Sequence, residues 1–173
     1  MFAVGVDVSH GRSTVAVLGA KRKVVMKPVE VPHTVDGFAS LAEKLNGLDG
    51  EVRIVMEHTG RYYESFAMSM YRAGFFVSAV NPLAIRDYQE GISVRKVKTD
   101  KADALKIAQF AIDKWEILPQ YTPMDTIRQQ LKLCSRQYNL YMKTVVSLQN
   151  NLISLTDKTF PGVNELFSSP ERA

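Results

Sequence analysis

The chain has 173 residues, of which 46% are hydrophobic and 23% charged, and this composition is typical of globular rather than disordered or membrane proteins. No apolar run approaches the roughly 18 residues needed to cross a bilayer. Cys134, the single cysteine, excludes an internal disulfide and a cysteine-based zinc site. With 22 lysines and arginines against 18 aspartates and glutamates, the net charge is only +4, which suits a polyanionic partner without requiring one.

The N-terminus does not have the pattern of a signal peptide. The stretch MFAVGVDVSH contains an acid, Asp7, and lacks both a basic leader and a long apolar run. We therefore expect a cytoplasmic protein with no membrane partner.

The first 31 residues predict three antiparallel strands. Apolar residues alternate with small or polar ones over residues 2–9, which is the period of a strand. Turn residues at 10–12 and 19–22 separate this segment from further strands at 13–18 and 24–31. The prediction is a meander of neighbouring strands.

From residue 34 onwards, helical and strand patterns alternate. The spacing predicts helices at residues 35–48 and 62–72, and strands at 52–56 and 75–80, the last of them closed by Asn81-Pro82. Apolar strands that alternate with helices pair in parallel in a covered sheet. The sequence therefore predicts an α/β fold with a mixed five-stranded sheet and flanking helices.

The C-terminal part is predicted to be helical. A helix is expected at residues 100–112, followed by a proline-containing linker at 115–123. A coiled-coil seam then extends over 124–158, where apolar residues are spaced alternately four and three apart: Ile127, Leu131, Cys134, Tyr138, Tyr141, Val145, Leu148, Leu152 and Leu155. We expect this helix to form a homodimer or tetramer. A single helix that folds back on its own domain is the alternative.

Four acids are candidates for a site. Asp7 lies within an apolar strand, where an unpaired carboxylate is costly. Glu57 follows the strand at 52–56, at the edge where open α/β sheets place their sites, although it could be an ordinary loop acid. Asp100 and Asp103 share one face of a first helical turn, where they could simply stabilise the helix.

Together the four acids could hold two divalent ions, Mg²⁺ or Mn²⁺. Hard cations prefer oxygen ligands, and a two-ion site clamps both oxygens of a phosphoryl displacement. A basic run beside the last two acids could hold the phosphates of a nucleic-acid strand, or could be a solvated charged loop. Its residues are Arg95, Lys96, Lys98 and Lys101.

Four segments of the chain resemble the DEDD insertion-sequence transposases related to the Piv invertases. The segments are GVDVSHGRSTVAVL, VMEHTGRYYE, VNPLAIRDYQEG and VRKVKTDKADALKIAQFA. The catalytic domain of that family is similar to the RuvC resolvase, with a ribonuclease H-like fold, and the resemblance implies the same fold for residues 1–114. It also assigns the family's four acids to Asp7, Glu57, Asp100 and Asp103.

The resemblance implies Mg²⁺-dependent DNA strand cleavage and exchange within an oligomer, and it makes a structured guide RNA a candidate partner, as in some members. Family members continue into a second domain with a nucleophilic serine. We therefore expect residues 159–173 to be a tail leading to that absent domain, and the fragment to be insufficient for the full reaction. Nothing in the sequence around Ser168 or Ser169 supports that role for either.

Three other functions remain open. A RuvC-like structure-selective nuclease would share the fold and the acids, and would cut branched DNA without the second domain. An actin-like ATPase or kinase would need a phosphate hairpin after the first aspartate, and residues 8–11 fit that hairpin poorly. A non-catalytic scaffold would bind RNA through the sheet domain and oligomerise through the coiled coil.

Overall fold

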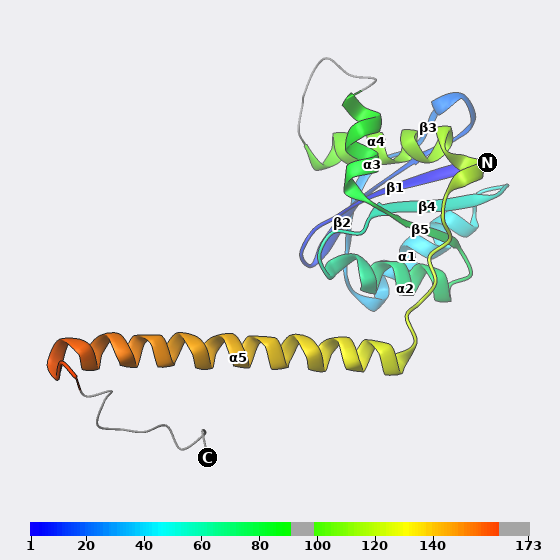
Figure 1. Cartoon of the computed structure of the whole chain (residues 1–173). Coiled ribbons are helices and arrows are strands. Elements are labelled where there is room, and N and C mark those ends of the chain that lie inside the picture. Colours follow the sequence, from blue (N-terminus) through cyan, green and yellow to red (C-terminus); the bar gives the residue numbers. More distant parts are fainter. Residues whose placement is uncertain (91–98, 163–173) are drawn as a thin grey trace. The chain divides into compact units, whose positions relative to one another are not determined.

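The structure, a computed structural model, describes residues 1–90 and 99–162 (Figure 1). The chain divides into two compact units, one of residues 1–123 and one that begins at Met124. The predicted phosphate contacts Arg95, Lys96 and Lys98 lie outside the described residues, as do Ser168 and Ser169.

The first unit is built on a five-stranded mixed sheet. Its strands are β1 (Phe2–Val8), β2 (Arg12–Leu18), β3 (Val24–Pro32), β4 (Val52–Glu57) and β5 (Phe76–Val80). The strand order is β3-β2-β1-β4-β5, with antiparallel pairing from β1 to β3 and parallel pairing of β1 with β4 and of β4 with β5. The predicted α/β sheet is confirmed, and β1 is its central strand.

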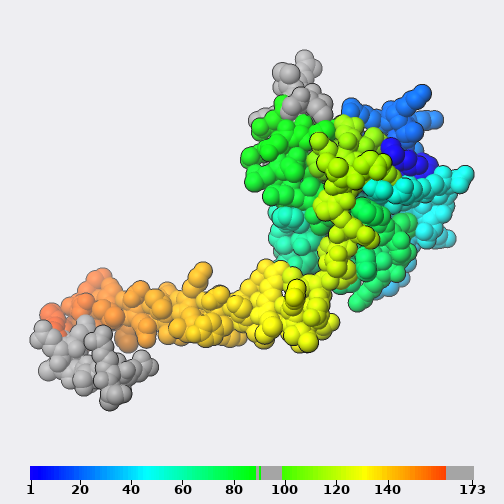
Figure 2. Space-filling view, turned by 45° about the vertical axis from the view of Figure 1, so that its right-hand side comes forward, coloured from blue at the N-terminus to red at the C-terminus, as the bar shows by residue number. Residues whose placement is uncertain are grey.

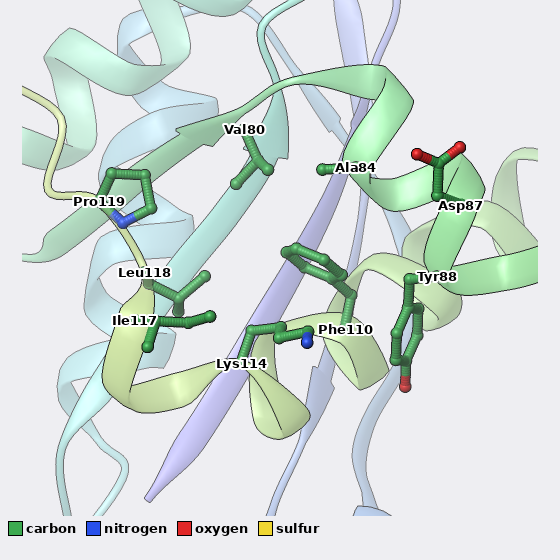
Figure 3. A pocket seen from close by; sticks show the side chains of 9 residues that line it. All are labelled: Val80, Ala84, Asp87, Tyr88, Phe110, Lys114, Ile117, Leu118 and Pro119. Carbon is green, nitrogen blue, oxygen red and sulfur yellow. The ribbon is translucent and has the colours of Figure 1, made fainter. Parts of the chain in front are cut away.

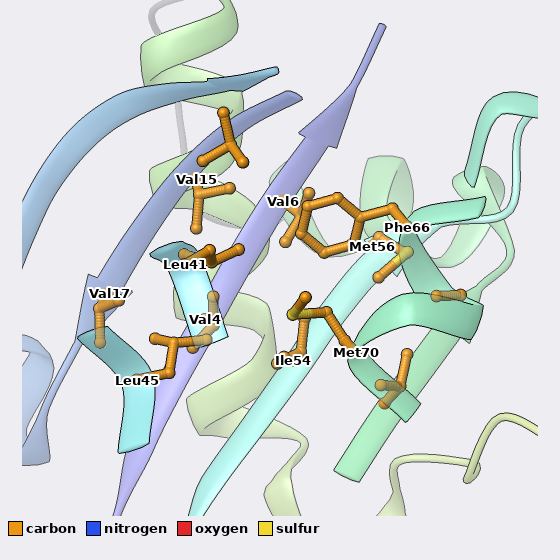
Figure 4. Packing of buried hydrophobic residues seen from close by; sticks show 13 residues of the cluster. Val4, Val6, Val15, Val17, Leu41, Leu45, Ile54, Met56, Phe66 and Met70 are labelled. Atoms are coloured by element: carbon orange, nitrogen blue, oxygen red, sulfur yellow. The ribbon is translucent and has the colours of Figure 1, made fainter. Parts of the chain in front are cut away.

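One face of the sheet packs against two helices. Val4 and Val6 of β1 are fully buried on this face. They join side chains of β2, β4, α1 (Val35–Asn46) and α2 (Tyr62–Arg72) in one cluster, and Figure 4 shows the members pointing toward one another. Thr34 caps α1 by accepting a hydrogen bond from the Gly37 amide at 3.1 Å.

The opposite face of the sheet packs against α4 (Asp100–Asp113). Ala3 and Val55 belong to the cluster on this side, with Ile107 and Ala111 of the helix. Successive residues of β1 therefore pack into two different hydrophobic clusters, one on each face of the sheet. Asp7 comes two residues after Gly5 and so lies on the α4 side.

A helix that the sequence analysis missed, α3 (Pro82–Glu90), follows β5. The sequence pattern at Asn81-Pro82 indicates only the end of a strand. The Asn81 side chain accepts a hydrogen bond from the Leu83 amide at 3.0 Å, and proline suits the first helical position because its missing N–H needs no partner there. Figure 2 shows α3 (green) beside α4 and the segment after it (yellow-green).

The segment expected to be a linker, residues 115–123, packs in part against the sheet. It begins with a short 3₁₀ helix, η2 (Trp115–Ile117), and both Trp115 and Leu118 are buried. The Arg53 guanidinium lies over the Trp115 ring at 4.5 Å and over the Phe76 ring at 4.7 Å, and it donates a hydrogen bond to the Trp115 carbonyl.

The second unit contains one long helix, α5 (Thr126–Thr159), which confirms the predicted C-terminal helix. Asp125 caps it by accepting a hydrogen bond from the Ile127 amide at 3.0 Å. None of the α5 side chains is buried, and the large apolar residues of the predicted seam are exposed. Pairing with another chain stays a prediction. Within residues 1–90 and 99–162, no helix is long and apolar enough to cross a membrane.

Candidate active site

Asp7 and Glu57 lie next to each other at one edge of the sheet. The parallel register of β1 and β4 ends with the pair Val6 and Met56, and each acid is the next residue of its strand. Side chains two residues apart in a strand lie on the same face of the sheet. Asp7 is two residues after Gly5, and Glu57 is two residues after Val55, and both of these residues face α4. The two carboxylates therefore share the α4 face at the C-terminal edge of the central parallel strands.

Helix α4 brings a third acid to this edge. Ala104 and Ala108 lie directly against Gly5, so the first half of the helix crosses β1 just before Asp7. The other end of α4 leads to Trp115, which is bonded to Arg53 near the start of β4. The helix therefore runs opposite to β1 and β4, and its first turn, with Asp103, lies at the edge that carries Glu57.

The electrostatics of Glu57 reflect this crowding. Burial raises the pKa of its carboxyl above the ordinary value of 4.5, and the negative charge of Asp103 raises the pKa further. The Thr59 hydroxyl, which donates a hydrogen bond to Glu57 at 3.4 Å, and the nearby His58 offset only part of this increase in pKa. A bound cation would remove the repulsion that causes part of this shift.

Asp100 and Asp103 differ in their surroundings, although both lie in the first turn of α4. Asp103 is half-buried and accepts a hydrogen bond from the Lys106 ammonium at 2.8 Å. Asp100 is exposed at the first residue of the helix. Thr99 caps this turn by accepting from the Ala102 amide at 3.2 Å. Because Thr99 supplies the cap, neither carboxylate is needed for it.

The donor chemistry fits a hard divalent cation. Carboxylate oxygens are the ligands that Mg²⁺ takes from proteins, and one or two of them are usually enough when water and substrate phosphates complete the shell. Across the described part of the chain, no group of three or more acidic, histidine or cysteine side chains is close enough to hold an ion by itself. The fourfold acidic cluster therefore stays a prediction.

Of the four basic residues expected to contact phosphates, the structure describes Lys101. It is exposed on the first turn of α4, between Asp100 and Asp103 in the sequence. An ammonium group at this position could reach a phosphate near the acids.

Sequence reasoning missed three residues that lie at the same edge of the sheet. His10, in the turn after β1, contacts the Tyr62 ring with centroids 5.1 Å apart. The Arg61 guanidinium lies 5.9 Å from the centroid of the same ring. For Arg61 and Tyr62 the available signal was the segment HTGRYY, which follows Glu57 directly and places basic and aromatic side chains between the end of β4 and the start of α2.

An apolar hollow of about 440 Å³ lies on the α4 side of the first unit (Figure 3). Val80, Tyr88, Phe110 and Leu118 line it, and none of the four candidate acids does. Tyr88 also donates a hydrogen bond to Asp113, which receives a second one from Arg22 at 2.7 Å, so this region joins α3 to the end of α4. The hollow is not part of the acidic site.

Sequence similarity to a known family extends over nearly the whole chain. The family model for transposases of the DEDD, IS110 type matches residues 4–161. The chain belongs to this DEDD transposase family. The match confirms the resemblance of the four sequence segments, and it includes both the sheet domain and α5 of this transposase chain.

The structure of RuvC from Thermus thermophilus is similar to that of this transposase chain. The likeness has a TM-score of 0.50 at 16% identity and covers 70% of this chain and 100% of RuvC. A complex of T. thermophilus RuvC with a Holliday junction substrate gives a TM-score of 0.48 at 15% identity, over 70% of this chain and 99% of that one. No curated protein matches by sequence. The first likeness confirms the predicted ribonuclease H-like fold.

Proposed function

We propose that this chain is the DNA strand-cleaving domain of a transposase, with divalent metal held by Asp7, Glu57, Asp100 and Asp103. The supporting observation is that Asp7 and Glu57 lie at the C-terminal ends of neighbouring parallel strands, on the face that α4 covers, where burial and then the charge of Asp103 raise the pKa of Glu57. The family assignment supports DNA as the substrate.

Each acid has its own part in this proposal. Asp7 and Glu57 lie at the C-terminal ends of the neighbouring strands β1 and β4, and Asp100 and Asp103 approach from a helix whose position depends on Gly5. A bound Mg²⁺ or Mn²⁺ would supply Lewis-acid stabilisation of the phosphoryl oxygens. Lys101, with Arg95, Lys96 and Lys98, would orient the DNA backbone without reading its sequence.

Strand exchange, a guide RNA and a homo-oligomer extend the proposal. The exposed apolar side chains of α5 support association with further copies, and the transposase family supports strand exchange. If a guide RNA is used, a discrete RNA should copurify with the protein. Purified protein that exchanges strands after ribonuclease treatment would contradict the RNA component.

The test uses the protein as its gene encodes it. Asp7→Asn and Asp103→Asn should each lower Mg²⁺-dependent strand cleavage on the order of 100-fold or more, because each removes a charged oxygen ligand beside the reacting phosphate. They should also abolish the rise in melting temperature that Mg²⁺ or Mn²⁺ produces. Asp36→Asn, at an exposed acid in the first turn of α1, is the control and should change neither measurement. Wild-type cleavage by both site variants would refute the proposal.

A structure-selective nuclease is the second candidate, because the likeness covers the whole length of RuvC. If these 173 residues alone cut branched DNA with Mg²⁺ and Asp7→Asn abolishes the cutting, the nuclease function is favoured. If the protein instead exchanges strands between two DNA duplexes with Mg²⁺, the transposase function is favoured. The kinase alternative gains no support from the family assignment.

A further inference from the structure

Three side chains beside the acidic edge form an aromatic and basic cluster, which we call the edge patch: His10, Arg61 and Tyr62. Tyr62 is the first residue of α2 and is 39% exposed. The His10 ring meets the Tyr62 ring edge to face, with 77° between their planes. The Arg61 guanidinium lies within cation–π distance of the Tyr62 ring. Two exposed groups that can bind anions, His10 and Arg61, thus both contact the exposed Tyr62 ring.

The edge patch adjoins the proposed active site through the backbone. His10 lies in the turn that follows β1, three residues after Asp7, and Arg61 and Tyr62 follow Glu57 by four and five residues. The contact between His10 and Tyr62 joins the two loops that leave the acid-bearing strands. Tyr62 begins α2, and α2 packs on the face of the sheet opposite α4. The edge patch and Asp103 therefore lie on opposite sides of the sheet edge that carries Asp7 and Glu57.

The exposure of Tyr62 is not required by the fold. Phe66, Ala67 and Met70 supply the buried face of α2, and the tyrosine lies outside that core cluster. Tyr71, at the other end of the same helix, is also 39% exposed, but its ring contacts Tyr121 of the same domain at 6.3 Å. Tyr62 instead contacts a histidine and an arginine, which are groups suited to a nucleotide.

We propose that the edge patch binds an unpaired nucleobase of the DNA strand at the active site, with the base stacked on Tyr62 and its phosphate beside Arg61 and His10. Tyrosine rings stack on every base because each base has a π face, and arginine adds attraction for the phosphate. A strand that crosses the sheet edge would meet the acids on one side and the edge patch on the other. This inference rests on the proposed function, since it takes DNA as the ligand.

The test measures binding of a short fluorescein-labelled single-stranded DNA in EDTA, by anisotropy, so that neither metal nor cleavage contributes. Tyr62→Ala should weaken binding about 10-fold, and Tyr62→Phe should bind like the wild type because phenylalanine keeps the stacking ring. Tyr71→Ala, with the same exposure in the same helix, should have no effect. Replacing one base by an abasic site should weaken wild-type binding but cause no further loss in Tyr62→Ala.

The outcomes separate this inference from the proposed function. Asp7→Asn should retain the Tyr62-dependent binding even though it loses cleavage, so a failure of the metal site leaves the edge patch intact. Equal affinity of Tyr62→Ala, Tyr71→Ala and wild type would refute the edge patch. If Tyr62→Ala weakens binding of RNA of the same sequence and leaves DNA binding unchanged, the proposal of a DNA base is wrong.

Discussion

Gly5 of β1 lies directly against Ala104 of α4, and a Cβ added to Gly5 would be 2.1 Å from the Ala104 carbonyl oxygen. The same Cβ would be 2.3 Å from the amide nitrogen of Ala108. Both neighbours are helix backbone, which has no rotamer that could relieve the overlap. The absence of a side chain at Gly5 therefore sets how closely α4, with Asp103, approaches the strand that carries Asp7.

The first prediction follows from this contact. Gly5→Ala should lower the free energy of unfolding by about 3 kcal/mol or more, because the helix must move away from the sheet. It should also lower strand cleavage in any folded fraction, since Asp103 moves with the helix. Urea unfolding and a cleavage assay below the unfolding transition measure the two effects.

Gly47→Ala is the matched control for this substitution. Gly47 has φ −74 at the C-terminal cap of α1, and the nearest atom to an added Cβ is the Lys44 oxygen at 3.5 Å. Alanine at this position should stabilise the protein by about 0.4–1 kcal/mol, because it lowers the conformational entropy of the unfolded chain. If Gly5→Ala is as stable and active as this control, the close approach of α4 does not determine the site.

The second prediction concerns pH. The pKa of Glu57 is raised in the folded state, chiefly by burial and further by Asp103, so between 4.5 and its folded value the native protein binds more protons than the unfolded chain. The free energy of unfolding should therefore fall as pH rises through this window. In EDTA, Glu57→Gln should be more stable than wild type at pH 7, and the difference should vanish below about pH 4.5.

Chemical denaturation between pH 4 and 7 measures this difference, with the exposed Glu43→Gln as the control. Adding Mg²⁺ at pH 7 should stabilise the wild type and not Glu57→Gln, because a bound cation offsets the repulsion between the carboxylates. Stability curves of wild type and Glu57→Gln that run parallel across the whole range would show that Glu57 titrates normally.

Local patterns in the sequence were enough to predict most of the fold. Alternating valines and turn residues predicted the first three strands, and the helical spacing predicted α2 with its observed ends, Tyr62–Arg72. These features depend on neighbours a few residues apart, which a sequence shows directly.

Features that depend on tertiary contacts were not predictable in the same way. Among the α3 side chains that the structure describes, Ile85 is the one that is fully buried, so the apolar pattern of this helix is weak, and its cap, Asn81, is also typical of a strand end. The cation–π contact between Arg53 and Trp115 packs the start of segment 115–123 against the sheet, and no local pattern indicates that contact. The proximity of Asp103 to Glu57 depends on the direction in which α4 crosses β1, which no local pattern contains.

The third prediction concerns α5. Leu148 and Leu152 lie on its predicted seam and are 63% and 62% exposed, although leucines of a folded helix usually lose contact with water. Apolar residues recur at coiled-coil spacing from Ile127 to Leu155 of this 34-residue helix, which suits association with α5 of another copy. Leu148→Asp combined with Leu152→Asp should dissociate the oligomer, because each change costs at least the ~2–5 kcal/mol of truncating a buried leucine.

Multi-angle light scattering at matched concentrations measures this effect. The control adds the same two carboxylates to the opposite side of the helix, as Ser147→Asp with Asn150→Asp, and should leave the mass unchanged. Circular dichroism of the whole chain should show that both double variants remain folded. A wild-type chain that is monomeric at high micromolar concentration would contradict the coiled coil, and equal masses for the seam variant and the control would place the contact elsewhere.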